Sequence, residues 1–275
     1  MPKTKRKGRA STLAKTLLAT GLKRILAGAA IGAFSSTVAY ANNVHENYAV
    51  LFSGGYNAAN NHLRCYEETL RMWNIATGLL DFDIDKVFAL FADGTDIMKD
   101  RTPGEFVDFT PANWVNSNWS AITSVGGNIN MATPGNLQTT LSMLSSTITP
   151  EDSFYFWSFN HGSNPSFANC PNVALNSPNS PILNQQQLDG SCMPQSPGSN
   201  LSDVLLTAWN EESISDAEFA SWIDPINAKA EVYAFAQCFS GGMVDNLFPA
   251  SNRFAAYSAA ADRCSFLITH KPPRP

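Results

Sequence analysis

The sequence contains few charged side chains: they account for 15% of the 275 residues, and the formal net charge is −5. Because the chain carries no net positive charge, nothing electrostatic attracts it to nucleic acid, and we expect no nucleic-acid partner. After residue 41 the sequence also lacks an apolar run long enough to cross a bilayer, so we expect no membrane span in the mature protein. A chain of this length suits one medium α/β domain with a substantial core.

Only five cysteines are present, and no two of them have the CxxC spacing of a zinc or redox site. We therefore expect no metal centre and no cofactor. In an oxidising compartment an odd number of cysteines leaves one thiol free. If that thiol is Cys238, the favoured bridges are Cys170–Cys192, within one irregular loop, and Cys65–Cys264. Burial as reduced thiols explains these four side chains equally well.

Basic residues are concentrated at the N-terminus, where five of the first nine positions are lysine or arginine. An apolar stretch over residues 25–38 follows and leads into Ala39-Tyr40-Ala41. This order is typical of a secretory signal peptide, residues 1–41, cleaved after Ala41. A membrane anchor is the alternative, but glycine, serine and threonine make the apolar stretch short and mild for a span. We therefore predict an exported protein, secreted or periplasmic, with its working domain in residues 42–275.

Apolar runs of strand length alternate with segments of helical spacing. We predict strands at 47–53, 86–92, 153–160, 231–237 and 253–260, and helices capped by Asn60 or Asn61, Thr133 and Ser215. A hairpin or edge strand around 106–109 and a helix over 240–248 complete the prediction. The order strand, helix, strand requires right-handed crossovers, which pair the strands in parallel. The predicted fold class is therefore α/β, with a mostly parallel central sheet of five to six strands.

Two of the predicted strands lead into a reactive side chain. Residues 153–160 are followed by His161-Gly162-Ser163, and residues 231–237 by Cys238. In a parallel sheet both side chains would lie at the carboxyl edge, where open α/β sheets form their sites. A thiol becomes a useful nucleophile when a neighbouring imidazole takes its proton. Considered singly, each residue is explained as well by a turn histidine or a buried cysteine, and the pair together indicates a cysteine hydrolase.

A long loop insertion, residues 164–202, starts just after this histidine and is rich in proline, asparagine and serine. Loops of this length within a compact domain are usually functional or disordered. A lid over the site is one role that its position allows.

Three aspartates, Asp81, Asp83 and Asp85, alternate along the chain as in a calcium loop. The glycine and the distal glutamate of an EF-hand are missing. We therefore interpret the segment as an acidic turn before a strand and predict no metal there.

Five motifs together resemble the legumain and caspase group of cysteine peptidases, and the legumain-like branch fits best. They are YAVLFSGGYN at 48–57, FWSFNHGS at 156–163, SDAEFASWI at 215–223, VYAFAQCFSGGM at 232–243 and FAAYSAAADRCSF at 254–266. The motifs cover most of residues 47–266 in order. The resemblance implies a three-layer α-β-α sandwich and a peptidase that needs no cofactor.

The resemblance also implies a role for each site residue. Cys238 would be the nucleophile and His161 the general base and acid, in a dyad that forms a thioacyl-enzyme. Backbone N–H groups of Gly162 and Cys238 would form the oxyanion hole, and the start of a helix after Cys238 would favour the thiolate. Asn57 or Asn60, in the loop after the first strand, is a candidate to orient the histidine. The expected partner is a peptide or protein substrate.

Substrate preference and reaction outcome stay open at this point. Legumains that cleave after asparagine carry a glutamate two residues before the cysteine, where this chain has Ala236. Ala236 and Asp262 are the candidate pocket residues. A transpeptidase, in which an amine replaces water at the second step, and a secreted binding module without catalysis are the alternatives to an endopeptidase.

Overall fold

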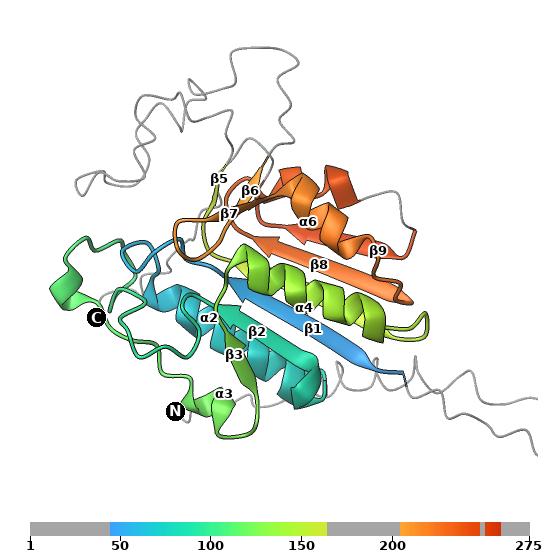
Figure 1. Cartoon of the computed structure of the whole chain (residues 1–275), viewed down its shortest axis with the longest axis horizontal. Coiled ribbons are helices and arrows are strands. Elements are labelled where there is room, and N and C mark those ends of the chain that lie inside the picture. Colours follow the sequence, from blue (N-terminus) through green and yellow to red (C-terminus); the bar gives the residue numbers. More distant parts are fainter. Residues whose placement is uncertain (1–44, 164–203, 248–250, 260–275) are drawn as a thin grey trace, which may run out of the picture. The chain divides into compact units, whose positions relative to one another are not determined.

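The computed structural model describes residues 45–163, 204–247 and 251–259 (Figure 1). Its main sheet has six parallel strands in the spatial order β3-β2-β1-β4-β8-β9. The strands are β1 (Asn47–Ser53), β2 (Val87–Phe91), β3 (Asn128–Asn130), β4 (Ser153–Phe159), β8 (Ala230–Ala236) and β9 (Arg253–Tyr257). The predicted α/β class and the parallel sheet are confirmed.

Helices cover both faces of this sheet. The principal helices are α2 (Leu63–Asn74), the four-residue α3 (Ser120–Thr123), α4 (Pro134–Thr147) and α6 (Asp216–Ile223). In Figure 1, α4 and α6 lie on the near face, whereas α2 lies behind the sheet. The predicted three-layer α/β sandwich is therefore confirmed. No helix among the described ranges is both long enough and apolar enough to span a lipid bilayer.

The central strand β1 explains why the core has two halves. Its alternate residues belong to different clusters, with Val50 and Phe52 packing on the α4 and α6 side. Ala49 and Leu51 pack on the other side, with residues of α2 and α3. Because both faces are covered, residues 48–52 of β1 are continuously apolar instead of alternating with polar residues, as expected for a strand in a buried parallel sheet.

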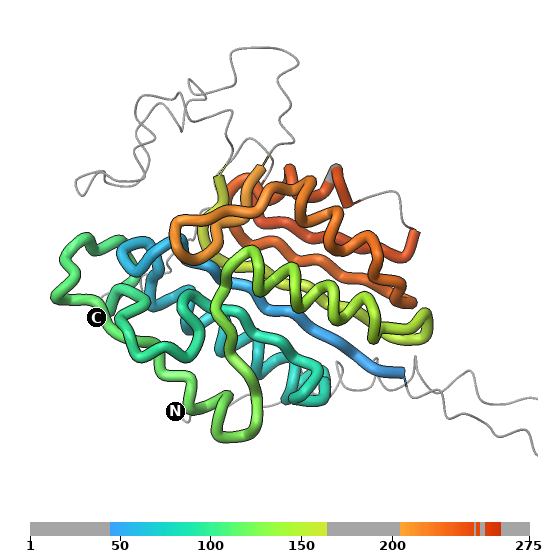
Figure 2. The backbone as a smooth tube through the Cα atoms, in the orientation of Figure 1, coloured from blue at the N-terminus to red at the C-terminus, as the bar shows by residue number. Residues whose placement is uncertain are grey.

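A second, small antiparallel sheet was not predicted. It consists of β5 (Gly162–Ser163), β6 (Leu205–Thr207) and β7 (Ser213–Ser215). A Cβ atom on Gly54 would lie 2.3 Å from the Thr207 carbonyl oxygen, so the backbone of β6 runs directly against the turn after β1. In Figure 2 the hairpin formed by β6 and β7, in orange, reaches the carboxyl end of β1. Only a glycine permits such a close backbone approach.

Several predicted elements need correction. Residues 106–109 form no strand, and the Asp108 backbone N–H instead donates to the Ala59 carbonyl oxygen at 3.3 Å. Instead of a helix over 240–248, two short 3₁₀ turns, Ser240–Met243 and Asp245–Leu247, follow the cysteine. The helix after β1 continues as a π-helical turn, Ile75–Leu79, and further 3₁₀ turns occur at Ile84–Lys86 and Pro111–Asn113. The signal peptide, the loop insertion over 164–202 and the predicted bridge Cys170–Cys192 lie outside the described residues.

Replacing Ser215 by alanine should destabilise the protein by about 1 kcal/mol. Ser215 caps α6 through a capping box: its Oγ accepts from the Glu218 N–H at 3.2 Å, and its own N–H donates to Glu218 Oε2 at 3.0 Å. Without the hydroxyl, a helix-terminal N–H loses its acceptor. Chemical denaturation measures the loss, with Ser213→Ala, an exposed position in the same strand, as the control. Equal effects of both substitutions would contradict the role of the cap.

Candidate active site

His161 and Cys238 follow neighbouring strands at the same edge of the sheet. In the pairing of β4 with β8, Phe159 is the register partner of Ala236, and each reactive residue comes two positions later. A Cβ atom on Gly162 would lie 2.3 Å from the Cys238 carbonyl oxygen. The segment that carries the imidazole therefore lies directly against the backbone that carries the thiol.

This edge is also the topological switch point of the sheet. From β1 the chain builds outward through β2 to β3, and from β4 it builds in the opposite direction through β8 to β9. The connections after β1 and β4 therefore lead to opposite sides of the sheet, and such switch points are where open α/β sheets generally form their sites. His161 follows β4, and the loop over residues 54–62 follows β1.

The His161 ring is anchored by the loop after β1. Its Nε2 atom lies 2.9 Å from the backbone carbonyl oxygen of Asn60. A carbonyl can only accept a hydrogen bond, so Nε2 carries the proton of the neutral ring and Nδ1 keeps a lone pair. Burial lowers the pKa of His161, and the hydrogen bond to Asn60 opposes this in part. The neutral, basic form is therefore favoured near neutral pH.

Asn60 contacts the histidine through its main-chain carbonyl and not through its side chain. The Asn60 side chain instead donates to Asn57 Oδ1 at 2.8 Å. Asn57 Oδ1 also accepts from the Asn60 backbone N–H at 3.2 Å, and Asn57 Nδ2 donates to Glu211 at 3.0 Å. Asn57 thus fixes the turn that presents the Asn60 carbonyl, one step removed from the imidazole.

Two further asparagines beside His161 were missed by the prediction. Asn160 accepts from the His161 backbone N–H at 2.9 Å, and its Nδ2 donates to Ser53 Oγ at 3.1 Å and to Asn61 Oδ1 at 3.3 Å. Asn61 is fully buried and donates to the Asp100 carbonyl oxygen at 2.8 Å. These bonds join the ends of β1 and β4. In the sequence both residues look like ordinary turn asparagines, so the pattern alone gave no signal.

The turn that carries Cys238 is tied to the end of β9. Cys238 is half-buried, and Phe239 has a left-handed backbone conformation, with φ of 60°. Ser240 Oγ accepts from the backbone N–H groups of Ser258 at 3.2 Å and Ala259 at 3.1 Å. Because only a four-residue 3₁₀ turn follows, the predicted stabilisation of a thiolate by a helix N-terminus is wrong: so short a turn has no substantial macrodipole.

The candidate pocket residues have different outcomes. Ala236 is half-buried at the end of β8, beside Phe159 of β4. Asp262 lies outside the described residues, and so does Cys264.

Cys65 is a free thiol with 3% of its surface exposed, so the predicted bridge Cys65–Cys264 is not formed in the structure. Burial raises the pKa of the Cys65 thiol to about 12, which makes it a poor nucleophile.

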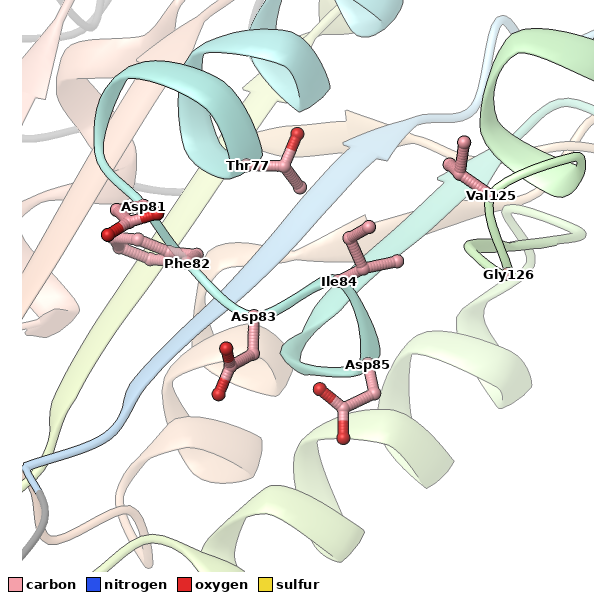
Figure 3. A pocket seen from close by; sticks show the side chains of 8 residues that line it. All are labelled: Thr77, Asp81, Phe82, Asp83, Ile84, Asp85, Val125 and Gly126. Atoms are coloured by element: carbon pink, nitrogen blue, oxygen red, sulfur yellow. The ribbon is translucent and has the colours of Figure 1, made fainter.

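An open hollow of about 510 Å³ lies at the opposite end of the sheet, before β2 and β3. Asp81, Asp83 and Asp85 are among its lining residues, but Figure 3 shows the Asp81 side chain apart from the other two. Asp83 is 2.8 Å from Lys86 Nζ, so a cation already balances this carboxylate. Within the described residues, no three His, Cys, Asp or Glu side chains are grouped so that they could hold a metal ion.

Comparison with known proteins adds no family to this geometry. No protein-family model matches the chain, and no curated protein matches it significantly. The chemistry of the edge formed by β4 and β8 therefore has to be inferred from the residues and contacts described above.

Proposed function

We propose that this chain is a cysteine endopeptidase of the legumain and caspase type, with Cys238 and His161 as its catalytic dyad. One observation carries the proposal: Gly162 lies against the backbone of Cys238 while His161 Nε2 is held by the Asn60 carbonyl oxygen at 2.9 Å. The bonded Nε2 fixes the tautomer, and the free lone pair belongs to Nδ1. A thiol and a base on adjacent strand ends are the two groups that acyl transfer requires.

The proposed reaction has two steps. Nδ1 of His161 takes the Cys238 proton as the sulfur attacks the carbonyl carbon of a peptide bond. The imidazolium then gives this proton to the departing amine as the C–N bond breaks, leaving a thioester on Cys238. In the second step His161 takes a proton from water as the water oxygen attacks the thioester carbon. The C–S bond then breaks, the carboxylic acid leaves, and the imidazolium returns its proton to the Cys238 sulfur.

Backbone N–H groups of Gly162 and Cys238 would stabilise the negative oxygen of each tetrahedral intermediate. Donors of this kind contribute about 3 kcal/mol each when they are fixed in advance. The closeness of Gly162 to Cys238 supports this role, since a Cβ atom there would also lie 2.7 Å from Gln237 Cγ. A glycine therefore lets the two amide segments approach each other.

Labelling with iodoacetamide tests the proposal. Alkylation of Cys238, followed by peptide mapping, should be at least about a hundredfold slower in His161→Ala than in the unchanged protein, because the base that activates the thiol is gone. His45→Ala is the matched control, since the His45 side chain is 57% exposed and remote in the fold from Cys238. Equal labelling of Cys238 in the presence and absence of His161 would favour a binding module without catalysis.

Cleavage of a mixed peptide library would then define the substrates. Loss of all cleavage in Cys238→Ala is expected for an endopeptidase. New peptide bonds among the products would identify the transpeptidase instead.

A further inference from the structure

A second imidazole lies against His161. The ring centroids of His62 and His161 are 5.3 Å apart, and the ring planes meet at 76° in an edge-to-face contact. His62 comes two residues after Asn60 and is the N-cap residue of α2, so the predicted cap at Asn60 or Asn61 is wrong. The next residue, Leu63, donates its backbone N–H to the Gly104 carbonyl oxygen at 3.0 Å, which fixes the end of this loop.

One hydrogen bond does not define the orientation of an imidazole. With Nε2 held by Asn60, the His161 ring can still tilt about the line of that bond, and Nδ1 would move with the tilt. A second ring packed at a steep angle removes this freedom. Both constraints come from one short loop, because Asn60 supplies the acceptor and His62 supplies the wall.

We propose that His62 is a positioning residue for His161, which fixes the plane of the catalytic imidazole and restricts the pair of rings to one positive charge. The catalytic part of this inference rests on the proposed function. The contact between the rings does not.

The charges around the two rings agree with this assignment. Burial and the neighbouring His161 lower the pKa of His62 to about 4, and a contact with the Phe106 backbone opposes this in part. His62 Nδ1 is buried and has no hydrogen-bond partner within residues 45–163, 204–247 and 251–259. Among the residues that the structure describes, no carboxylate contributes to the pKa shift of either ring. The nearby Arg64 and Glu105 affect the buried Cys65. A second proton on the pair would therefore be uncompensated.

Acid should consequently lower the free energy of unfolding. Both imidazoles have a pKa below the ordinary 6.5 in the folded state. As pH falls below that value, the unfolded chain takes up protons that the folded chain resists, so stability decreases with falling pH. The decrease due to His62 should continue down to about pH 4, where its ring becomes charged in the folded protein.

Two substitutions of His62 separate the packing of its ring against His161 from its ability to take up a proton. His62→Ala removes both, whereas His62→Phe keeps an aromatic wall that cannot titrate. Because the chain has only four histidines, imidazole NMR can follow His161 directly. In His62→Ala the His161 ring loses part of its cover, so we expect its pKa, which burial lowers, to rise. Alkylation of Cys238 should slow by about tenfold or more, since a misplaced base loses rate steeply. His62→Phe should restore most of the rate and should remain folded at a lower pH than the unchanged protein.

Each result bears on a different part of the inference. An unchanged His161 titration and an unchanged alkylation rate in His62→Ala would overturn the positioning role. A rate in His62→Phe as low as in His62→Ala would overturn the aromatic wall. If Cys238 labelling is insensitive to His161→Ala, the peptidase proposal fails, but the NMR titration of His161 still tests the contact between the rings.

Discussion

Gly162→Ala should reduce alkylation of Cys238 and any peptide cleavage by about a hundredfold or more. The new Cβ atom would lie 2.3 Å from the Cys238 carbonyl oxygen and 2.7 Å from Gln237 Cγ. The first of these contacts is to backbone, so it cannot be relieved by a side-chain rotation. The strand ends must separate, and a shift of about 1 Å between base and nucleophile is enough to cost a hundredfold in rate.

Gly135→Ala is the matched control for this experiment. A Cβ atom on Gly135, in the first turn of α4, meets nothing within 4 Å. Alanine also favours helix over glycine by about 1 kcal/mol, so this variant should be neutral or more stable. Rates should be compared at a temperature where unfolding experiments show both variants folded. Wild-type reactivity in folded Gly162→Ala would mean that the two segments are not held together as described.

The strands that position the site could be predicted because their sequences are continuous and apolar. Residues 47–53 form the predicted strand, β4 ends one residue before the predicted end at 160, and β8 begins one residue before its predicted start. Strand β3 was missed because it has only three residues, two of them asparagine. Parallel pairing followed from the order of elements, since crossover connections leave little choice of direction. The adjacency of residues 161 and 238 at one edge follows from the same order.

The polar framework around His161 could not be predicted in the same way. Its main acceptor is the backbone carbonyl of Asn60, and every residue type offers the same carbonyl group. Asn160 and Asn61 pair across 99 positions of sequence, and periodicity carries no information about such contacts. The ring contact of His62 likewise depends on how the turn over residues 57–60 closes. Side chains that act through distant loops become visible only in the fold.

Glu231→Ala should destabilise the protein by about 3–5 kcal/mol, because it leaves a buried guanidinium without its partner. Glu231 is 1% exposed at the start of β8, and Arg253 Nε of β9 lies 2.9 Å from its Oε2. Tyr233 donates to the same carboxylate at 2.6 Å, and Asn252 donates to Oε1 at 3.2 Å. Both donors would lose a buried acceptor together with the arginine. The exposed Asp224, 3.0 Å from Arg253, would remain and limit the loss.

The exposed pair Arg71–Glu68 provides the comparison for Glu231→Ala. Its atoms lie 3.1 Å apart, but the arginine side chain is 64% exposed, so Glu68→Ala should change the free energy of unfolding by less than about 1 kcal/mol. Replacing both buried partners, as Glu231→Leu with Arg253→Met, should cost less than Glu231→Ala alone, since no unpaired charge is left. Denaturant unfolding measures all three. The network lies at the amino end of β8 and Cys238 at the other, so alkylation of the folded fraction should be unchanged. A loss no larger than that of Glu68→Ala would show that the guanidinium is not desolvated.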